Sequence, residues 1–242
     1  LEQDGFPAAN VENIEYATIR AAVNLINADT SDWTGLQQVN VTRAEGLDLE
    51  SADTTDIKVS GANGAIDLAG GLNVTVNDST ADNAINIGES GAGTTNPAGT
   101  IDVTDSDQGN GTMDIDGGTD VTVTSTADQD TTGTTAGDIT IGANDAASGD
   151  VIVTQNLNSN GTAASPLTGS AIAVTGGTSV DATVNSTIDA ADETATDNIT
   201  NGALTVTSDG NTTDVSLTQT SDVTPFEEEE TFEPATQEIT FD

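Results

Sequence analysis

The chain has 242 residues, of which 41 are acidic and three are basic, so its formal net charge is −38. A surface this acidic repels the phosphates of nucleic acids and of anionic lipids, which excludes both as direct partners. Cysteine and histidine are absent, and this excludes disulfides, structural zinc, haem ligation and a Ser-His-Asp triad. Hydrophobic residues make up 34% of the chain and aromatic residues only 2%, which indicates a thin core of small aliphatic side chains.

The first segment, residues 1–64, differs from the rest because it holds the one Trp, the one Tyr and all three basic residues. Apolar side chains alternate at Val39 and Val41 and again at Leu47 and Leu49, which is typical of strands. Residues 14–26 follow no single period, so a short helix competes there with strands. We predict that this segment forms an N-terminal cap made of the first strands of the body that follows.

Residues 65–220 contain three loose repeats, over 65–111, 112–170 and 171–220. Each repeat opens with two apolar-alternating runs joined by Gly-Gly: "AIDLAGGLNVTV", "TMDIDGGTDVTV" and "AIAVTGGTSVDATV". A second pair of such runs follows in each repeat, for example "DITIGANDAASGDVIVT" at 138–154. The steps from Gly71 to Gly118 and from Gly118 to Gly177 are 47 and 59 residues, and the variation lies in the Asp-, Thr- and Gly-rich connectors.

Internal repetition decides the predicted fold class, which is all-β and elongated. Short strands with aliphatic side chains inward, Thr or Asp outward and Gly-rich corners fit a parallel β-solenoid. An antiparallel β-sandwich is the alternative, but few bulky residues are present to fill the space between its two sheets. A disordered low-complexity tract agrees with the charge but not with the persistent two-residue period. Residues 221–242, with a Glu run and two Pro, read as an acidic linker with an exit strand at "QEITFD".

Three stretches carry a resemblance to a known family: "GDITIGANDAASGDVIVTQN", "GSAIAVTGGTSVDATVNST" and "NGALTVTSDGNTTDVSLTQT". They resemble the repeats of RTX-related bacterial surface-layer (S-layer) proteins, and "DTSDWTGLQQVNVTRAEG" resembles the segment ahead of those repeats. The resemblance implies a secreted, calcium-dependent β-solenoid that leaves the cell by type I export and forms a lattice on the cell surface. The calcium-binding nonapeptide "GGxGxDxUx" of RTX repeats is missing, although "IDGGTDVTV" at 115–123 comes near it.

The strongest candidate for a cation site is "DVTDSDQGNGTMDIDGGTD" at 102–120, because oxygen ligands at alternating positions with a Gly bend are typical of a calcium loop. The predicted Ca²⁺ ligands are Asp102, Asp105, Asp107, Asn110, Asp114, Asp116 and Asp120. The competing interpretation is a polar corner between coils. Two weaker candidates are Asp78 with Asp82, and Asp128 with Asp130.

We therefore expect an extracellular structural protein without enzymatic activity, whose partners are copies of itself and divalent cations. A cell-surface polysaccharide is a further partner that a surface lattice would meet. Catalysis on carbohydrate is disfavoured because residues 59–224 contain no aromatic and no basic side chain. No apolar run approaches the roughly 20 residues of a transmembrane helix. The alternative function is a stalk repeat of a large secreted adhesin or a phage-encoded surface decoration protein.

Overall fold

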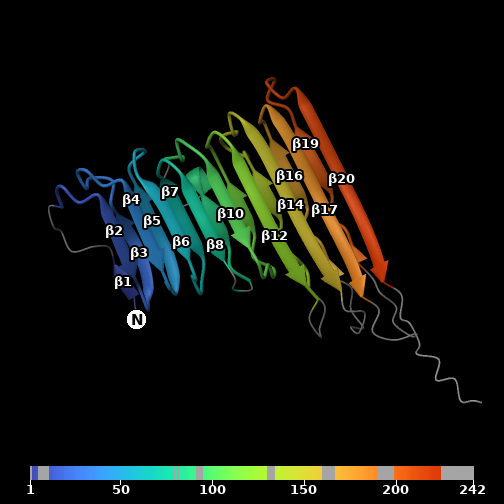
Figure 1. Ribbon diagram of the computed structural model, residues 1–242, viewed down its shortest axis with the longest axis horizontal. Helices are drawn as coiled ribbons and strands as arrows, with labels where there is room; N and C mark the ends of the chain where they lie inside the picture. The colour runs from blue at the N-terminus through green and yellow to red at the C-terminus, as the bar shows by residue number, and fades with distance from the viewer. Residues whose placement is uncertain are drawn as a thin grey trace, which may run out of the picture.

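The chain forms a parallel β-solenoid in a computed structural model that describes residues 2–4, 11–78, 80, 82–90, 95–129, 134–159, 167–189 and 199–224. Two nine-stranded sheets face each other, and the chain alternates between them as it winds along the stack (Figure 1). Every pairing between the named strands is parallel, as in β12 with β14. The predicted solenoid is therefore confirmed, and the antiparallel sandwich is wrong.

The two sheets contain alternate strands of the chain. The first sheet contains β1 (Glu2–Asp4), β3 (Asn24–Asp29), β5 (Gly46–Ser51), β7 (Ile66–Gly70), β9 (Ile85–Ile87), β11 (Met113–Ile115), β13 (Ile139–Ile141), β16 (Ile172–Thr175) and β19 (Leu204–Thr207). The second sheet contains β2 (Tyr16–Arg20), β4 (Gln38–Thr42), β6 (Asp56–Ser60), β8 (Val74–Asp78), β10 (Ile101–Asp105), β12 (Val121–Asp128), β14 (Asp150–Ser159), β17 (Ser179–Asp189) and β20 (Asp214–Thr224). A small pair, β15 (Leu167–Thr168) with β18 (Ile199–Thr200), and a 3-10 turn at Gly88–Ser90 complete the described elements.

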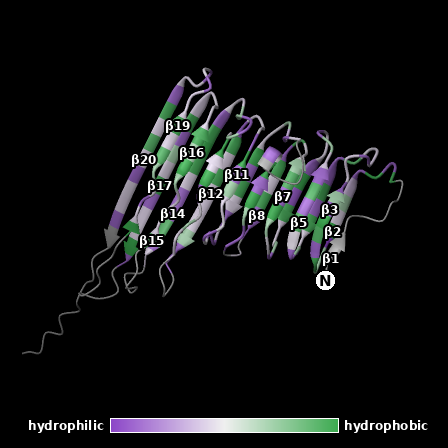
Figure 2. Ribbon diagram, turned by 180° about the vertical axis from the view of Figure 1, so that it is seen from behind, coloured by the Kyte–Doolittle hydropathy of each residue, from purple (hydrophilic) through white to green (hydrophobic). Residues whose placement is uncertain are grey.

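The core consists of columns of aliphatic side chains that run from layer to layer between the two sheets. In the first sheet Ile85, Met113, Ile139 and Ile172 occupy one column, and each is 0–1% exposed. Hydrophobic and polar residues alternate along the strands in Figure 2, as expected where one face of a sheet is buried. β-branched residues suit these columns because their side chains stand stiffly on a pleated surface and stack on their equivalents.

Gly-Gly pairs form the corners that turn the chain from one sheet to the other. Both glycines of each pair have positive φ, for example 80° at Gly117 and 79° at Gly118. A Cβ on Gly118 would lie 2.9 Å from Ile101 Cδ1 of the preceding coil, and one on Gly177 would lie 2.9 Å from Val151 Cγ2. The corner therefore requires glycine both for its backbone conformation and for the close approach of adjacent coils.

The described strands differ in places from the segments predicted from the sequence. β2 and β3 lie within residues 14–29, so the short helix considered there is wrong. Strands from residues 1–64 belong to the same two sheets as those from the repeats, and each step between Gly-Gly pairs spans two coils. β20 continues to Thr224, past the predicted end of the repeats at residue 220. The exit strand predicted at "QEITFD" lies outside the described residues.

Candidate cation-binding and assembly surfaces

The seven predicted calcium ligands are distributed around a whole coil and do not form one loop. Asp102 points outward from β10, and Asp114 is a half-buried residue of β11 in the other sheet. Asp105 ends β10 and begins a corner that contains exposed Asp107 and Asn110. The other two, Asp116 and Asp120, lie in the opposite corner, between β11 and β12. Within the described ranges, no group of three or more acidic side chains could hold a metal ion.

Asp116 is held by the next coil. The residue is 1% exposed, and its carboxylate accepts hydrogen bonds from the backbone N–H of Asn144 at 2.8 Å and of Asp145 at 3.2 Å. The Asn144 side-chain amide donates to the second oxygen of Asp116 at 2.8 Å. These three bonds tie the Asn144–Asp145 turn to the coil before it, so this Asp acts as a link between layers.

A row of polar side chains also links adjacent layers where strands of the second sheet begin. The Asp56 carboxylate accepts a hydrogen bond from the Asn73 side-chain amide at 2.9 Å, and the side-chain oxygen of Asn73 accepts the N–H of Thr100 at 3.0 Å. Further along, the Asp120 carboxylate accepts the N–H of Asp150 at 2.8 Å. Each bond connects one layer to the next, so these Asp and Asn side chains help to fix the register of the stack.

Two buried carboxylates are neighbours in the second sheet. Asp78 and Asp105 are partners in register on β8 and β10, and each is 2% exposed. Burial raises the pKa of Asp105 to about 6, and the negative charges of Asp78 and Asp107 add to this shift. The backbone N–H of Asp107 donates to Asp105 Oδ1 at 3.1 Å and opposes the shift.

The hydrogen bonds of Asp78 show where its carboxylate lies. Asp78 accepts hydrogen bonds from the Thr80 N–H and the Asn83 side chain. The weaker candidate site at Asp78 and Asp82 is thus split, because Asp82 accepts the N–H of Asn110 instead.

A buried polar network occupies the corner of the coils that contain β12 and β14, and the sequence analysis missed it. Gln155 is 0% exposed; its amide donates to Ser170 Oγ at 2.5 Å, and its carbonyl oxygen accepts the N–H of Ser170 at 3.1 Å. The Ser125 hydroxyl also donates a hydrogen bond to the side-chain oxygen of Gln108 within this network. A sequence signal existed, because Ser125 and Gln155 fall on the inward positions of their alternating strands.

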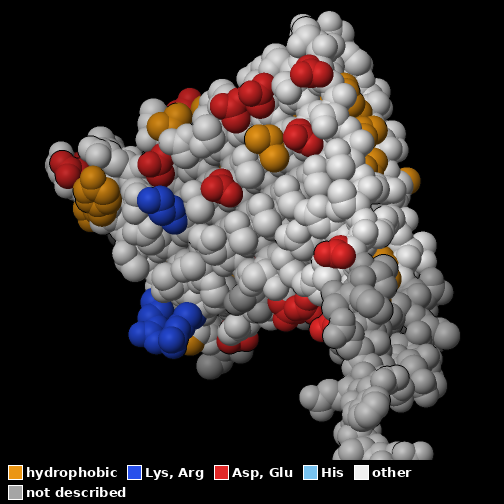
Figure 3. All heavy atoms as spheres, turned by 45° about the vertical axis from the view of Figure 1, so that its right-hand side comes forward, with side chains coloured by type: hydrophobic (Ala, Val, Ile, Leu, Met, Phe, Trp, Pro, Cys, Tyr) orange, Lys and Arg blue, Asp and Glu red, His pale blue; other side chains and the backbone are white. Residues whose placement is uncertain are grey.

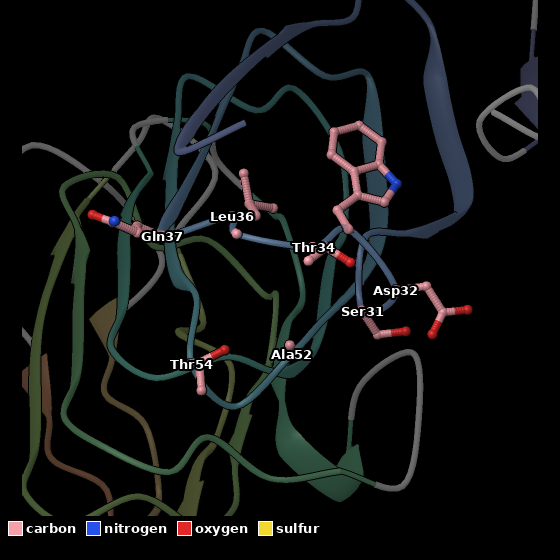
Figure 4. Close-up of a pocket in the computed structure, with 9 residues that line it drawn as sticks. Ser31, Asp32, Thr34, Leu36, Gln37, Ala52 and Thr54 are labelled. Atoms are coloured by element: carbon pink, nitrogen blue, oxygen red, sulfur yellow. The ribbon is translucent and has the colours of Figure 1, made fainter. Parts of the chain in front are cut away.

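An open hollow of about 560 Å³ lies beside the single tryptophan. Trp33, Asp32, Gln37 and Thr54 are among the residues that line it. In Figure 4, Ser31 and Asp32 lie on one side and Gln37 on the opposite side. The Asp29 carboxylate accepts both the N–H of Ser31 at 2.8 Å and its hydroxyl at 2.6 Å, which fixes the turn before Trp33. This hollow therefore combines an aromatic ring with polar groups.

Charge is distributed unevenly along the stack. The three basic side chains, Arg20, Arg43 and Lys58, are exposed on or next to β2, β4 and β6, at the N-terminal end. Figure 3 shows them toward that end, whereas acidic side chains extend over the face in view. Beyond Lys58 the sequence has no basic residue, so the opposite end is purely acidic.

Comparison with protein-family models, with curated proteins and with solved structures gives no match. Among the described residues, no helix is long and apolar enough to cross a membrane.

Proposed function

We propose that this chain is a segment of an extracellular structural protein, of the surface-layer or sheath class, that self-assembles into a cell-surface lattice after type I export. One observation supports this most directly, namely the unbroken stack of nine parallel strands in each sheet. Such a stack is stiff because the backbone hydrogen bonds of each inner layer are made to both of its neighbours. Stiffness and a repeated surface suit a building element better than a site of chemistry.

Divalent cations, calcium above all, are the proposed partners of this assembly. Copies with a net charge of −38 repel one another, and the outward face of the first sheet places Asp48, Asp67, Asn86 and Asp114 in one column. Neighbouring strands are about 4.8 Å apart, so carboxylates of this column are close enough for copies to share a hard, oxygen-seeking cation between them. The Asn86 amide donates to Asp67 at 2.5 Å, which keeps that carboxylate within the column.

The test is light scattering with electron microscopy on the full chain, from EDTA into millimolar Ca²⁺, with Na⁺ at matched ionic strength as the control. Growth into sheets or filaments in Ca²⁺ alone is the expected result. Equal growth in Na⁺ would overturn the calcium dependence, and a monomer in every condition would overturn self-assembly.

A stalk or decoration role is the second candidate, and the hollow at Trp33 favours it. Carbohydrate ligands stack on aromatic rings and bond to carboxylates and amides of the kind found at Asp32 and Gln37. If this role holds, the chain binds a cell-surface polysaccharide, and Trp33→Ala abolishes binding. Tyr16→Ala is the control, because Tyr16 is 63% exposed and does not line the hollow.

A further inference from the structure

The C-terminal end of the stack presents a long strand with one free edge. β20 has 11 residues and pairs with β17, and within the described part of the chain it has no partner on its other side. An open strand edge of this length offers a row of N–H and C=O groups to any strand that approaches it.

The backbone hydrogen bonds of the inner layers show which groups point off this end. In the second sheet, the N–H of Ile57 donates to the carbonyl of Asn73 in the next coil, and that of Val74 donates to Thr100. Val215 of β20 occupies the same column, because it pairs with Val180 and the column continues back to Val74. By this pattern, the N–H of Val215 points away from the molecule.

Apolar side chains are uncovered at the same end. Val215 and Leu217 are each 47% exposed, whereas their partners Val180 and Ala182 on β17 are 1% exposed. A hollow of about 490 Å³ opens there between the sheets, lined by residues that include Leu204 and Leu217. Hydrophobic side chains run along the right-hand edge of Figure 3, on the side where β19 and β20 lie.

The N-terminal end offers the complementary strand. Ala17 and Ile19 of β2 occupy the same two columns as Val215 and Leu217, and both are only partly buried. β2 pairs with β4 and with no other described strand. The next layer after β20 would therefore have the register and side chains that β2 already has.

Acidic side chains lie at both ends of the stack, and at the N-terminal end exposed Glu12 and Glu15 precede β2. Exposed Arg20 ends β2, whereas Asp209 and Asp214 lie at the other end, where the sequence has no basic residue. Hydrogen bonds from the N–H and side chain of Asn211 hold the pKa of Asp209 below its usual value, so its charge persists. The two ends therefore repel each other unless cations screen these charges, so the contact depends on the same cations as the proposed assembly.

We propose that a second copy of this chain docks head to tail, with its β2 parallel to β20 in the register Ala17 to Val215 and Ile19 to Leu217. This inference rests on the proposed self-assembly and identifies one of its contacts. In this arrangement the Val215 N–H donates to the Tyr16 carbonyl of the second copy, which continues the ladder of the inner layers. A head-to-tail contact of this kind does not close on itself, so it generates filaments.

Disulfide trapping tests the contact, because the chain has no native cysteine. The double variant Ile19→Cys/Leu217→Cys places two thiols on directly opposite residues of adjacent strands, at a separation that a disulfide spans. Mild oxidation should yield a ladder of dimers, trimers and longer species, since each molecule then carries one thiol at each end. The matched control is Ile19→Cys/Ile152→Cys, because Ile152 is 46% exposed but lies in the middle of the stack. Circular dichroism of each variant verifies that the solenoid is folded.

A second comparison uses charge in place of covalent trapping. Leu217→Lys should weaken association by about tenfold or more, because a buried lysine opposes strand pairing, whereas Ile152→Lys should leave it unchanged. Assembly of the native chain without the Ile19–Leu217 ladder, and without loss in Leu217→Lys, overturns this contact and leaves self-assembly standing. If the native chain stays monomeric and Ile19→Cys/Leu217→Cys forms no ladder, both proposals are overturned.

Discussion

The middle of the stack and its last layer have the same sequence pattern and different surroundings. Val151 and Val153 of β14 are 0% exposed, whereas Val215 and Leu217, in the same columns of β20, are 47% exposed. Alternation therefore decides which face of a strand turns inward, but burial requires a layer on each side. The sequence of a strand therefore determines its orientation, and the neighbouring layers determine its burial. Substitutions at equivalent positions of the two layers can measure how much this burial contributes to stability.

The largest expected effect on stability concerns the aliphatic column of the first sheet. Ile139→Ala should lower the free energy of unfolding by about 3–4 kcal/mol, because it leaves a cavity between two covered layers. Leu204→Ala, in the same column of the last layer, should cost about half as much, because Leu204 is only partly buried. Urea unfolding of dilute, monomeric protein measures both. Equal costs would contradict the distinction between middle and last layer.

A somewhat smaller effect is expected for the column of the second sheet that contains Gln155. Gln155→Leu should cost about 2–3 kcal/mol, because it removes the acceptor of the Ser170 N–H and the closer of two partners of the Ser170 hydroxyl in a fully buried corner. Gln219→Leu is the matched control, since this residue occupies the same column on β20 and is exposed. We expect it to change stability by less than about 0.5 kcal/mol. A stable Gln155→Leu variant would show that the network does not contribute to stability.

The orientation of the strands and the positions of the Gly-Gly corners were predictable from the sequence. Runs such as Ile139–Ile141 and Val151–Val153 determine the inward face from sequence alone, and the Gly-Gly pairs mark the corners correctly. The calcium loop was predicted from Asp spacing along the chain, and in a solenoid this spacing is a poor guide to proximity. Residues 102–120 contain two strands, β10 and β11, so their side chains point in different directions from different sheets.

Residues that meet across layers were the part that the sequence could not place. Asp116 contacts Asn144 and Asp145, 28 and 29 residues further along the chain. The connectors vary in length, so no fixed interval identifies such partners. The inward position of Asp105 was readable from the alternation in "IDVTD", yet its burial depended on β8 and β12 lying on either side.

The smallest expected effect on stability concerns the charge of that buried carboxylate. The pKa of Asp105 is about 6 in the folded chain, against 3.8 for an unperturbed carboxyl group, so the folded state retains this proton at a pH where the unfolded state has lost it. Its contribution to stability is therefore greatest below about pH 4, falls as the pH rises to about 6, and is then constant. Asp105→Asn removes the buried charge and keeps an oxygen for the N–H of Asp107, so it should raise the free energy of unfolding at pH 8 by about 2 kcal/mol.

Asp102→Asn is the control for this change, because Asp102 lies on the same strand and is exposed on the outer face. Both variants remove one negative charge from a chain of net charge −38, so any general relief of repulsion is common to them. Urea unfolding at pH 4, 6 and 8 should show a gain for Asp105→Asn that grows with pH, and little change for Asp102→Asn. If the two variants gained equally at pH 8, the effect would come from net charge, and burial of Asp105 between β8 and β12 would have no energetic consequence.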